Sequence, residues 1–133
     1  MSTFSLPKAN RLHSRKSIEE LFEKGESFFM HPIKVVAQMT TFNDDMAVKA
    51  AFSVSKRNFK HAVDRNRYKR LLRETYRLNQ SPLHENMAKE QHQLAVMFIY
   101  AVKEHNDYAT VEKAMKKALA KLQSKYSQTY TNA

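Results

Sequence analysis

Six cationic side chains crowd into residues 62–77, which read AVDRNRYKRLLRETYR. They are Arg65, Arg67, Lys69, Arg70, Arg73 and Arg77. Only Asp64 and Glu74 oppose them, and like charges recur three times at a spacing of four residues, which costs an isolated helix roughly 0.2–0.5 kcal/mol per pair. A polyanion reverses this cost, because every phosphate that a cation neutralises also releases condensed counterions. The stretch therefore predicts a helix that binds phosphate groups.

The type of cation and the residues upstream favour nucleic acid as the polyanion. Five of the six cations are arginine, whose planar guanidinium makes bidentate contacts with phosphate that lysine cannot make. The basic zone begins earlier, in SVSKRNFKHAVD, with Lys56, Arg57, Lys60 and His61. A membrane-surface helix is the main alternative, but its apolar side would carry Thr75 and two tyrosines, which suit a protein core better.

No pattern in the chain predicts a protein active site or a metal site. The histidines are His13, His31, His61, His84, His92 and His105, and none lies three or four residues from another. Cysteine is absent, and Asp44 with Asp45 suits a turn better than a Mg²⁺ site. The sequence shows neither a nucleophile–base pair nor a glycine-rich phosphate loop. We predict no catalytic and no metal-binding residues, so hydrolysis by this chain would depend on a partner.

The composition of the whole chain sets the class of protein. Its 133 residues are 42% hydrophobic, enough for one modest core, and its formal net charge is +10. A domain this basic usually binds a polyanion. The alternative explanation of the charge is a generally basic, soluble surface. The chain has no cysteine, no run of about 20 apolar residues and no secretory h-region, which predicts a soluble, cytoplasmic protein.

The elements that would position the basic helix begin with a short helix and three strands. SIEELFEKG (17–25) predicts a helix with a capping box of Ser17 and Glu20, ended by Gly25, the only glycine. The apolar stretches 33–39 and 46–54 predict two strands joined by a turn. SFFM (27–30) predicts a further edge strand.

The second half of the chain predicts a helix, a strand and a helix. The basic helix, over 64–78 with Asp64 as its N-cap, has an apolar side. That side consists of Tyr68, Leu71, Leu72, Thr75 and Tyr76. QLAVMFIY (93–100) predicts an interior strand buried on both faces, and a last helix follows, capped by Asn106 or Asp107. We predict one α+β domain over 1–133, in the order α-β-β-β-α-β-α, with helices packed on a mixed sheet, a flexible arm (1–10) and a frayed tail (125–133).

The stretch AFSVSKRNFKHAVDRNRYKRLLRETYR resembles the signature of the bacterial ribonuclease P protein component. In that family a strand ends near a serine and a basic pair, here Ser55, Lys56 and Arg57, and Arg-Asn-Arg-x-Lys-Arg then opens a helix. The upstream NRLHSRKSIEELFEKG is similar to the family's opening, so the likeness covers roughly residues 9–122. This chain departs from the pattern in NFKH (58–61), which is longer and lacks a glycine, in Ala51, where a glycine is common, and in Ile18, where an aromatic residue is common.

The resemblance implies a function, partners and a fold detail. Family members bind a large catalytic RNA, and together they remove the 5′ leader of precursor tRNA by Mg²⁺-dependent hydrolysis on the RNA, which holds most of the Mg²⁺. The resemblance also implies a left-handed β-α-β crossover around the basic helix, against the usual rule. It implies no membrane and no required protein partner. A ribosomal or architectural RNA-binding protein and a self-sufficient metal-dependent nuclease stay open as alternatives.

The resemblance also implies two sets of site residues. The residues expected to contact the RNA subunit are Arg65, Asn66, Arg67, Lys69, Arg70, Arg73, Arg57 and Lys60. Those expected to line a groove for the single-stranded leader, between the sheet and the first helix, are Phe22, Val36, Phe52, Ser55 and Lys56. Plain core packing is the alternative role for Phe22, Val36 and Phe52, and a helix-capping role is the alternative for Asn66.

Overall fold

A computed structural model describes residues 10–12 and 14–127 of the chain, and within them it has four helices and four strands. The elements in chain order are α1 (Arg15–Lys24), β1 (Glu26–Met30), β2 (Ile33–Thr40), β3 (Val48–Val54), α2 (Ala62–Asn79), α3 (Ser81–Lys89), β4 (Gln93–Tyr100) and α4 (Tyr108–Ser127). The predicted α+β class and element order are confirmed, with α3 as an additional helix. Most of the predicted arm lies outside the described residues, and α4 continues to Ser127, into the segment for which fraying is predicted.

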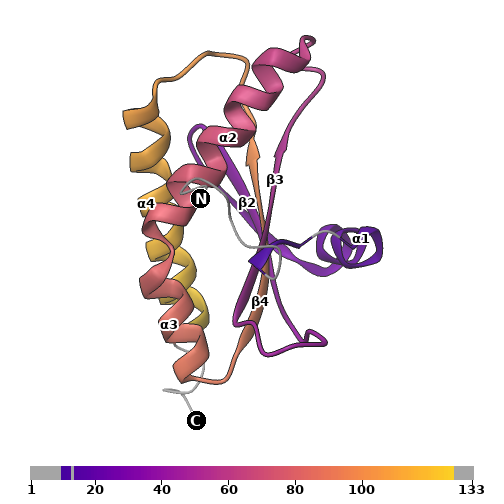
Figure 1. The fold of residues 1–133 in the computed structure, drawn as a ribbon, viewed down its shortest axis with the longest axis vertical. Helices are drawn as coiled ribbons and strands as arrows, with labels where there is room; N and C mark the ends of the chain where they lie inside the picture. The colour runs from indigo at the N-terminus through magenta and orange to yellow at the C-terminus, as the bar shows by residue number, and fades with distance from the viewer. Residues whose placement is uncertain (1–9, 13, 128–133) are drawn as a thin grey trace, which may run out of the picture.

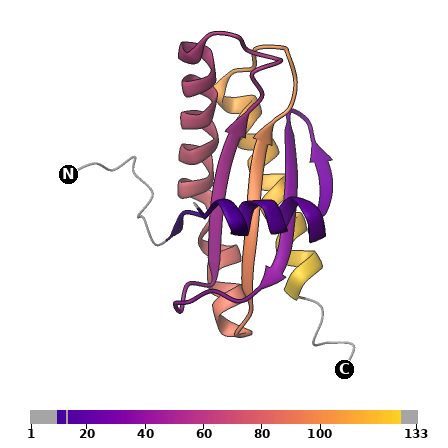
Figure 2. The same ribbon diagram turned by 90° about the vertical axis from the view of Figure 1, so that its right-hand side faces the viewer.

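The four strands form one mixed sheet in the order β1-β2-β4-β3. Only β3 and β4 run parallel, and α2 with α3 connects them. Helices α2, α3 and α4 cover one face of the sheet, and α1 crosses the other (Figure 1). In Figure 2, where α2 lies behind the sheet and both parallel strands point upward, β4 lies to the right of β3, so the crossover is left-handed.

The pairing register decides which side chains reach which face, because successive residues of a strand point to opposite sides. One face, which includes Val35 and Phe98, packs against α2, α3 and α4 to form the main core. The opposite face, which includes Val36 and Met97, forms a smaller core under Leu21 of α1. Strand β4 is thus buried on both faces, as its continuous apolar run predicts.

Helix starts differ from those predicted. Ser14, and not Ser17, caps α1: its Oγ accepts the Ser17 backbone N–H at 3.3 Å. Helix α2 begins at Ala62, two residues before Asp64, so Asp64 lies in the first turn and His61 holds the cap position without a side-chain hydrogen bond. In α1, two serines stand three residues apart and the sequence does not rank them. In α2, the cap position falls to His61, which is not among the residues usually found there. The predicted cap of α4 is confirmed for Asp107, whose Oδ1 accepts the Thr110 N–H at 2.9 Å.

Gly25 ends α1 as predicted, at a point where two backbones come close. Its φ of −75° and ψ of 161° are open to any residue, so backbone angles do not require glycine. A Cβ at this position would clash with the Leu21 carbonyl oxygen and lie 3.0 Å from the carbonyl oxygen of Ala37 in β2. Only glycine therefore fits between the last turn of α1 and β2 without moving either backbone.

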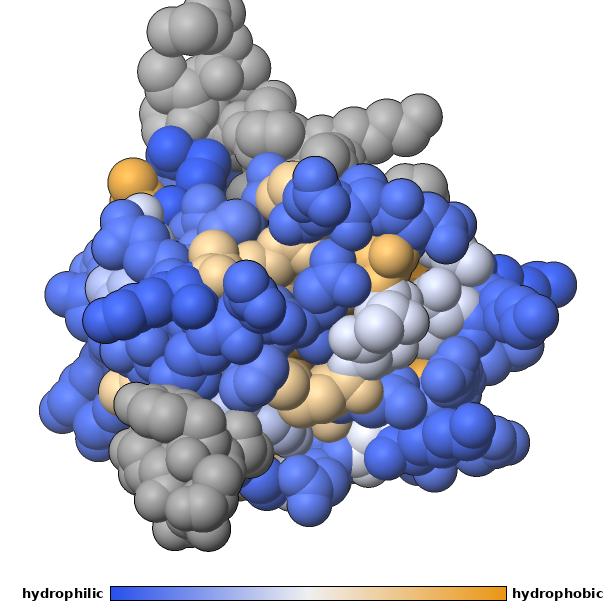
Figure 3. Space-filling model, turned by 90° about the horizontal axis from the view of Figure 1, so that it is seen from below, coloured by the Kyte–Doolittle hydropathy of each residue, from blue (hydrophilic) through white to orange (hydrophobic). Residues whose placement is uncertain are grey.

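The lower end of the molecule has a mainly polar surface (Figure 3). Figure 3, seen from the lower end of the molecule, shows small apolar patches separated by hydrophilic side chains. None of the helices in the described part of the chain has the length and apolar character needed to cross a membrane.

Tyr76 is the one fully buried tyrosine of α2 whose hydroxyl has no hydrogen-bond partner among the described residues. Burial raises its pKa above the usual range, and its ring packs against Phe52 and Phe98. We expect Tyr76→Phe to keep or raise the free energy of unfolding, by up to about 2 kcal/mol, because a buried unpaired hydroxyl is costly. Urea unfolding measures this, and a loss of stability would show that the hydroxyl has a partner.

Candidate nucleic-acid interface

Helix α2 divides into a buried side and a cationic side, as predicted. Tyr68, Leu72, Thr75 and Tyr76 are fully buried against the sheet and α4. Asn66, Arg67 and Arg70 are exposed, whereas Arg65, Lys69, Arg73 and Arg77 are half-buried. The cationic side therefore rests on a rigid core, which fixes the positions of the charges.

Arg65 lies apart from the other cations of α2 because the backbone engages it. Its Nη1 donates to the carbonyl oxygens of Phe59 at 2.8 Å and Lys60 at 2.7 Å, both in the connection between β3 and α2. The guanidinium thus closes that connection onto the first turn of the helix. This role was not predicted, and it makes Arg65 part of the fold whether or not it also contacts RNA.

The connection 55–61 makes a tight turn without a glycine. The Ser55 carbonyl oxygen accepts the Phe59 N–H at 3.1 Å, and the Ser55 Oγ accepts the Arg57 N–H at 3.1 Å. Phe59 is buried, and its ring centroid lies 5.1 Å from that of Tyr68. With Phe59 as the anchor, Lys56, Arg57 and Lys60 stay exposed beside the start of α2.

The loop from β4 to α4 also reaches the start of α2. The Tyr68 hydroxyl lies 2.8 Å from Nδ1 of the exposed His105 and accepts the Asn106 backbone N–H at 3.2 Å. The Asn106 side chain donates to the Tyr100 hydroxyl at 2.8 Å, and burial raises the pKa of Tyr100 to about 12. Sequence reasoning missed His105, because it lies 37 residues from Tyr68 in the chain and no local pattern links them.

A pocket of about 300 Å³ connects α2 with the α1 face of the sheet around the edge of β3. Its walls include Arg73 of α2, Phe52 and Ser53 of β3, and Ile18 of α1. The Arg73 guanidinium carbon lies 5.9 Å from the Phe52 ring centroid, so the cation and the aromatic ring share one wall. Residues predicted for two separate sites, Arg73 and Phe52, are thus brought together.

The five residues predicted for a leader groove do not form one surface. Val36 is buried on the α1 face of the sheet, whereas Phe52 packs on the opposite face against Phe98, with ring centroids 5.9 Å apart. Phe22 of α1 is 52% exposed, and Ser55 with Lys56 follows the end of β3. The grouping is therefore wrong for Phe52, since register places it on the helix side of the sheet.

The α1 face instead offers a row of side chains that α1 leaves open. Phe29, Lys34, Ile99 and Ser53 are paired across β1, β2, β4 and β3 in one register row. Phe29 is 53% exposed and Lys34 is exposed, whereas Ile99 packs beside the smaller core. This open row was missed, because four strands contribute one residue each and only the register aligns them.

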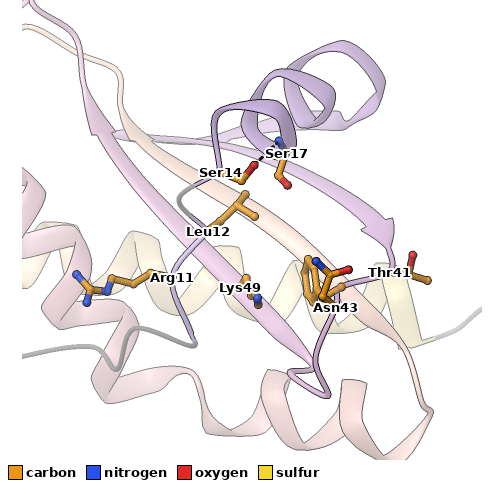
Figure 4. A pocket seen from close by; sticks show the side chains of 8 residues that line it. Arg11, Leu12, Ser14, Ser17, Thr41, Asn43 and Lys49 are labelled. Carbon is orange, nitrogen blue, oxygen red and sulfur yellow. Dashed lines mark hydrogen bonds between the residues drawn. The ribbon is translucent and has the colours of Figure 1, made fainter.

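A second pocket of about 300 Å³ lies at the start of α1, between its first turn and the β2–β3 connection (Figure 4). Ser14 and Ser17 line one side of it, and Lys49 lines the other. Lys49 is already paired with Asp44, with Nζ and Oδ2 2.9 Å apart, and this contact lowers the pKa of Asp44. The lysine is thus partly neutralised, so this pocket is a weaker anion site than the cationic side of α2.

No metal centre is formed by the described residues, in which no three His, Asp or Glu side chains gather closely enough to hold an ion.

Comparisons with known proteins identify the family. A family model described as Ribonuclease P matches residues 6–123. The ribonuclease P protein component of Porphyromonas gingivalis is 36% identical over 121 residues, covering 91% of this chain and 88% of that protein. The corresponding protein of Chlorobaculum tepidum is 31% identical over 105 residues, covering 74% of this chain and 68% of that protein.

Solved structures agree at the level of the fold. The RNase P protein of Staphylococcus aureus superposes with a TM-score of 0.67 at 19% identity, covering 85% of this chain and 94% of that one. The RNase P protein of Thermotoga maritima gives a TM-score of 0.67 at 21% identity, covering 84% and 96%. With a family model and close relatives that span most of its length, this chain belongs to the ribonuclease P protein family, the protein components of an RNA–protein endonuclease that processes tRNA.

Proposed function

We propose that this chain binds the catalytic RNA subunit of ribonuclease P and the 5′ leader of precursor tRNA, and so supports Mg²⁺-dependent endonucleolytic removal of the leader. In this proposal the phosphodiester chemistry takes place on the RNA, which holds most of the Mg²⁺. The observation that carries it is the cationic side of α2, mounted on a buried core and continued by the exposed Lys56, Arg57 and Lys60.

The proposed RNA-subunit surface consists of Asn66 and of exposed and half-buried cations of α2 and of the connection before it. This surface comprises Arg57, Lys60, Asn66, Arg67, Lys69, Arg70 and Arg73. A helix with cations on one side positions an RNA backbone by phosphate contacts and carries no sequence information by itself. Arg65 supports this surface through the connection that it holds.

The proposed leader surface is the open row on the α1 face together with Phe22. Exposed aromatic rings such as Phe22 and Phe29 provide stacking platforms for unpaired bases, and Lys34 provides a cation for the backbone. Ser55 and Lys56 stand at the end of β3, where this row approaches the RNA-subunit surface. Val36 contributes through the packing under α1 and not through exposed contact.

The test is cleavage of a precursor tRNA at low Mg²⁺ with the protein alone, a bacterial ribonuclease P RNA alone, and both. We expect cleavage at the mature 5′ end only when both are present. Activity of the protein alone would instead indicate a metal-dependent nuclease. Binding without any stimulation of the RNA would favour the alternative, an architectural RNA-binding protein.

Binding to the RNA subunit should weaken steeply with salt. If about six phosphates are neutralised, a plot of the logarithm of the binding constant against the logarithm of salt concentration should have a slope of about −4 to −5. Filter binding or fluorescence titration between about 50 and 200 mM salt measures this slope. A slope near zero would rule out phosphate contacts as the source of affinity.

A further inference from the structure

Helix α4 carries a second concentration of positive charge that the basic motif does not explain. It has five lysines and one acid, Glu112, whereas α2 has six cations and two acids. Each helix thus contributes a net charge of +4 to the total of +10. The two helices together account for most of the charge of the chain.

Four of the lysines of α4 form a line along the helix, which we call the α4 lysine row. It consists of Lys113, Lys117, Lys121 and Lys125, each four residues from the next, and all four are exposed. Its three like-charge pairs cost the isolated helix roughly 0.2–0.5 kcal/mol each, as in α2. Glu112 lies four residues from Lys116, outside the row, so α4 itself offers the row no compensating acid at helical spacing.

The two ends of the row differ in their surroundings. Lys125 pairs with Glu26 of β1 at 3.1 Å, and the Lys121 Nζ lies 4.7 Å from the Phe28 ring centroid. Among the described residues, Lys113 and Lys117 take part in no salt bridge and no cation–π contact. The half of the row nearer the start of α4 therefore keeps its charge available for a partner.

The position of the α4 lysine row indicates which RNA it would contact. Helices α4 and α2 lie side by side on one face of the sheet (Figures 1 and 2). Helix α1 and the open row of side chains lie on the opposite face. The loop before α4 contacts Tyr68 of α2, so an RNA on the cationic side of α2 is close to the start of α4, whereas the end of α4 lies over β1 at the far edge of the sheet. A strand bound on the α1 face is separated from α4 by the sheet (Figure 1). Charge complementarity and this arrangement both favour the RNA subunit.

We propose that the α4 lysine row, through Lys113 and Lys117, is a second contact surface for phosphates of the catalytic RNA subunit. The proposal rests on the proposed function, because it extends the contact surface for the same RNA from α2 to α4. It predicts that the affinity for this RNA depends on two helices, of which only one bears the recognised motif.

The experiment compares Lys113→Gln/Lys117→Gln with Lys16→Gln/Lys24→Gln, which removes the same charge from exposed positions of α1. Binding of a bacterial ribonuclease P RNA, and separately of a precursor tRNA, is measured across salt concentrations. For the α4 pair we expect about tenfold weaker binding of the RNA subunit at low salt and a salt slope shallower by about 1.5. The α1 pair should bind the RNA subunit nearly as the wild type does, and neither pair of substitutions should lower the melting temperature.

The outcomes separate the two proposals. Equal losses in both pairs would show a general effect of net charge and overturn the α4 surface, as would an α4 pair that binds like the wild type. A loss confined to precursor tRNA would overturn the choice of partner. Failure of the wild-type protein to bind the RNA subunit would instead overturn the proposed function itself.

Discussion

Replacing Gly25 with alanine should lower the free energy of unfolding by about 3 kcal/mol, the upper end of the usual cost of overpacking. The added Cβ meets two backbone carbonyl oxygens, those of Leu21 and Ala37, and backbone cannot move aside as a flexible side chain can. Relief requires the last turn of α1 to open at the Leu21 carbonyl and α1 to shift away from β2. Urea unfolding followed by circular dichroism measures the change.

The same substitution should also affect binding on the α1 face. Leu21 seals the smaller core, and Phe22 follows it directly, so a displaced α1 moves the proposed leader surface. We expect Gly25→Ala to weaken binding of a 5′ leader more than binding of the RNA subunit. Glu23→Ala, exposed on the same helix, is the control and should change neither stability nor binding. Wild-type stability of Gly25→Ala would show that α1 is not held against β2 as described.

Replacing Arg65 with alanine should lower the free energy of unfolding by about 2 kcal/mol, whereas Arg67→Ala should leave it unchanged. Arg65 loses two hydrogen bonds from a charged donor to backbone carbonyl oxygens, each of a kind worth about 1.5–3 kcal/mol before partial exposure reduces it. Arg67 is exposed, and its guanidinium carbon only approaches the Tyr68 ring at 5.7 Å. Thermal and urea unfolding of the two variants measure the difference.

Both substitutions should weaken binding of the RNA subunit, for different reasons. Arg67→Ala removes one direct contact, so the magnitude of the salt slope should fall by about one. Arg65→Ala releases the connection, and amide hydrogen exchange over residues 56–61 should therefore accelerate in the free protein. Unchanged exchange and stability in Arg65→Ala would show that the two carbonyl contacts do not hold the connection. Full RNA binding by Arg67→Ala would remove Arg67 from the proposed surface.

Local patterns were enough to predict α2 and the strands. The apolar side of α2 repeats at helical spacing, so Tyr68, Leu72 and Tyr76 are buried as expected. The continuous apolar run of β4 likewise predicts a strand covered on both faces. Helix α3 was not predicted, although Pro82 stands in its first turn, where proline is well tolerated.

The sequence by itself determined that this protein has a cationic helix on an α+β core, because charge and periodicity are properties of neighbouring residues. Only the tertiary structure decided what those residues touch. Strand register placed Val36 and Phe52 on opposite faces, and the path of the connection put Arg65 against backbone carbonyl oxygens. The fold also brought His105 to Tyr68. Each of these contacts joins segments whose meeting depends on how the whole chain packs, which no local pattern records.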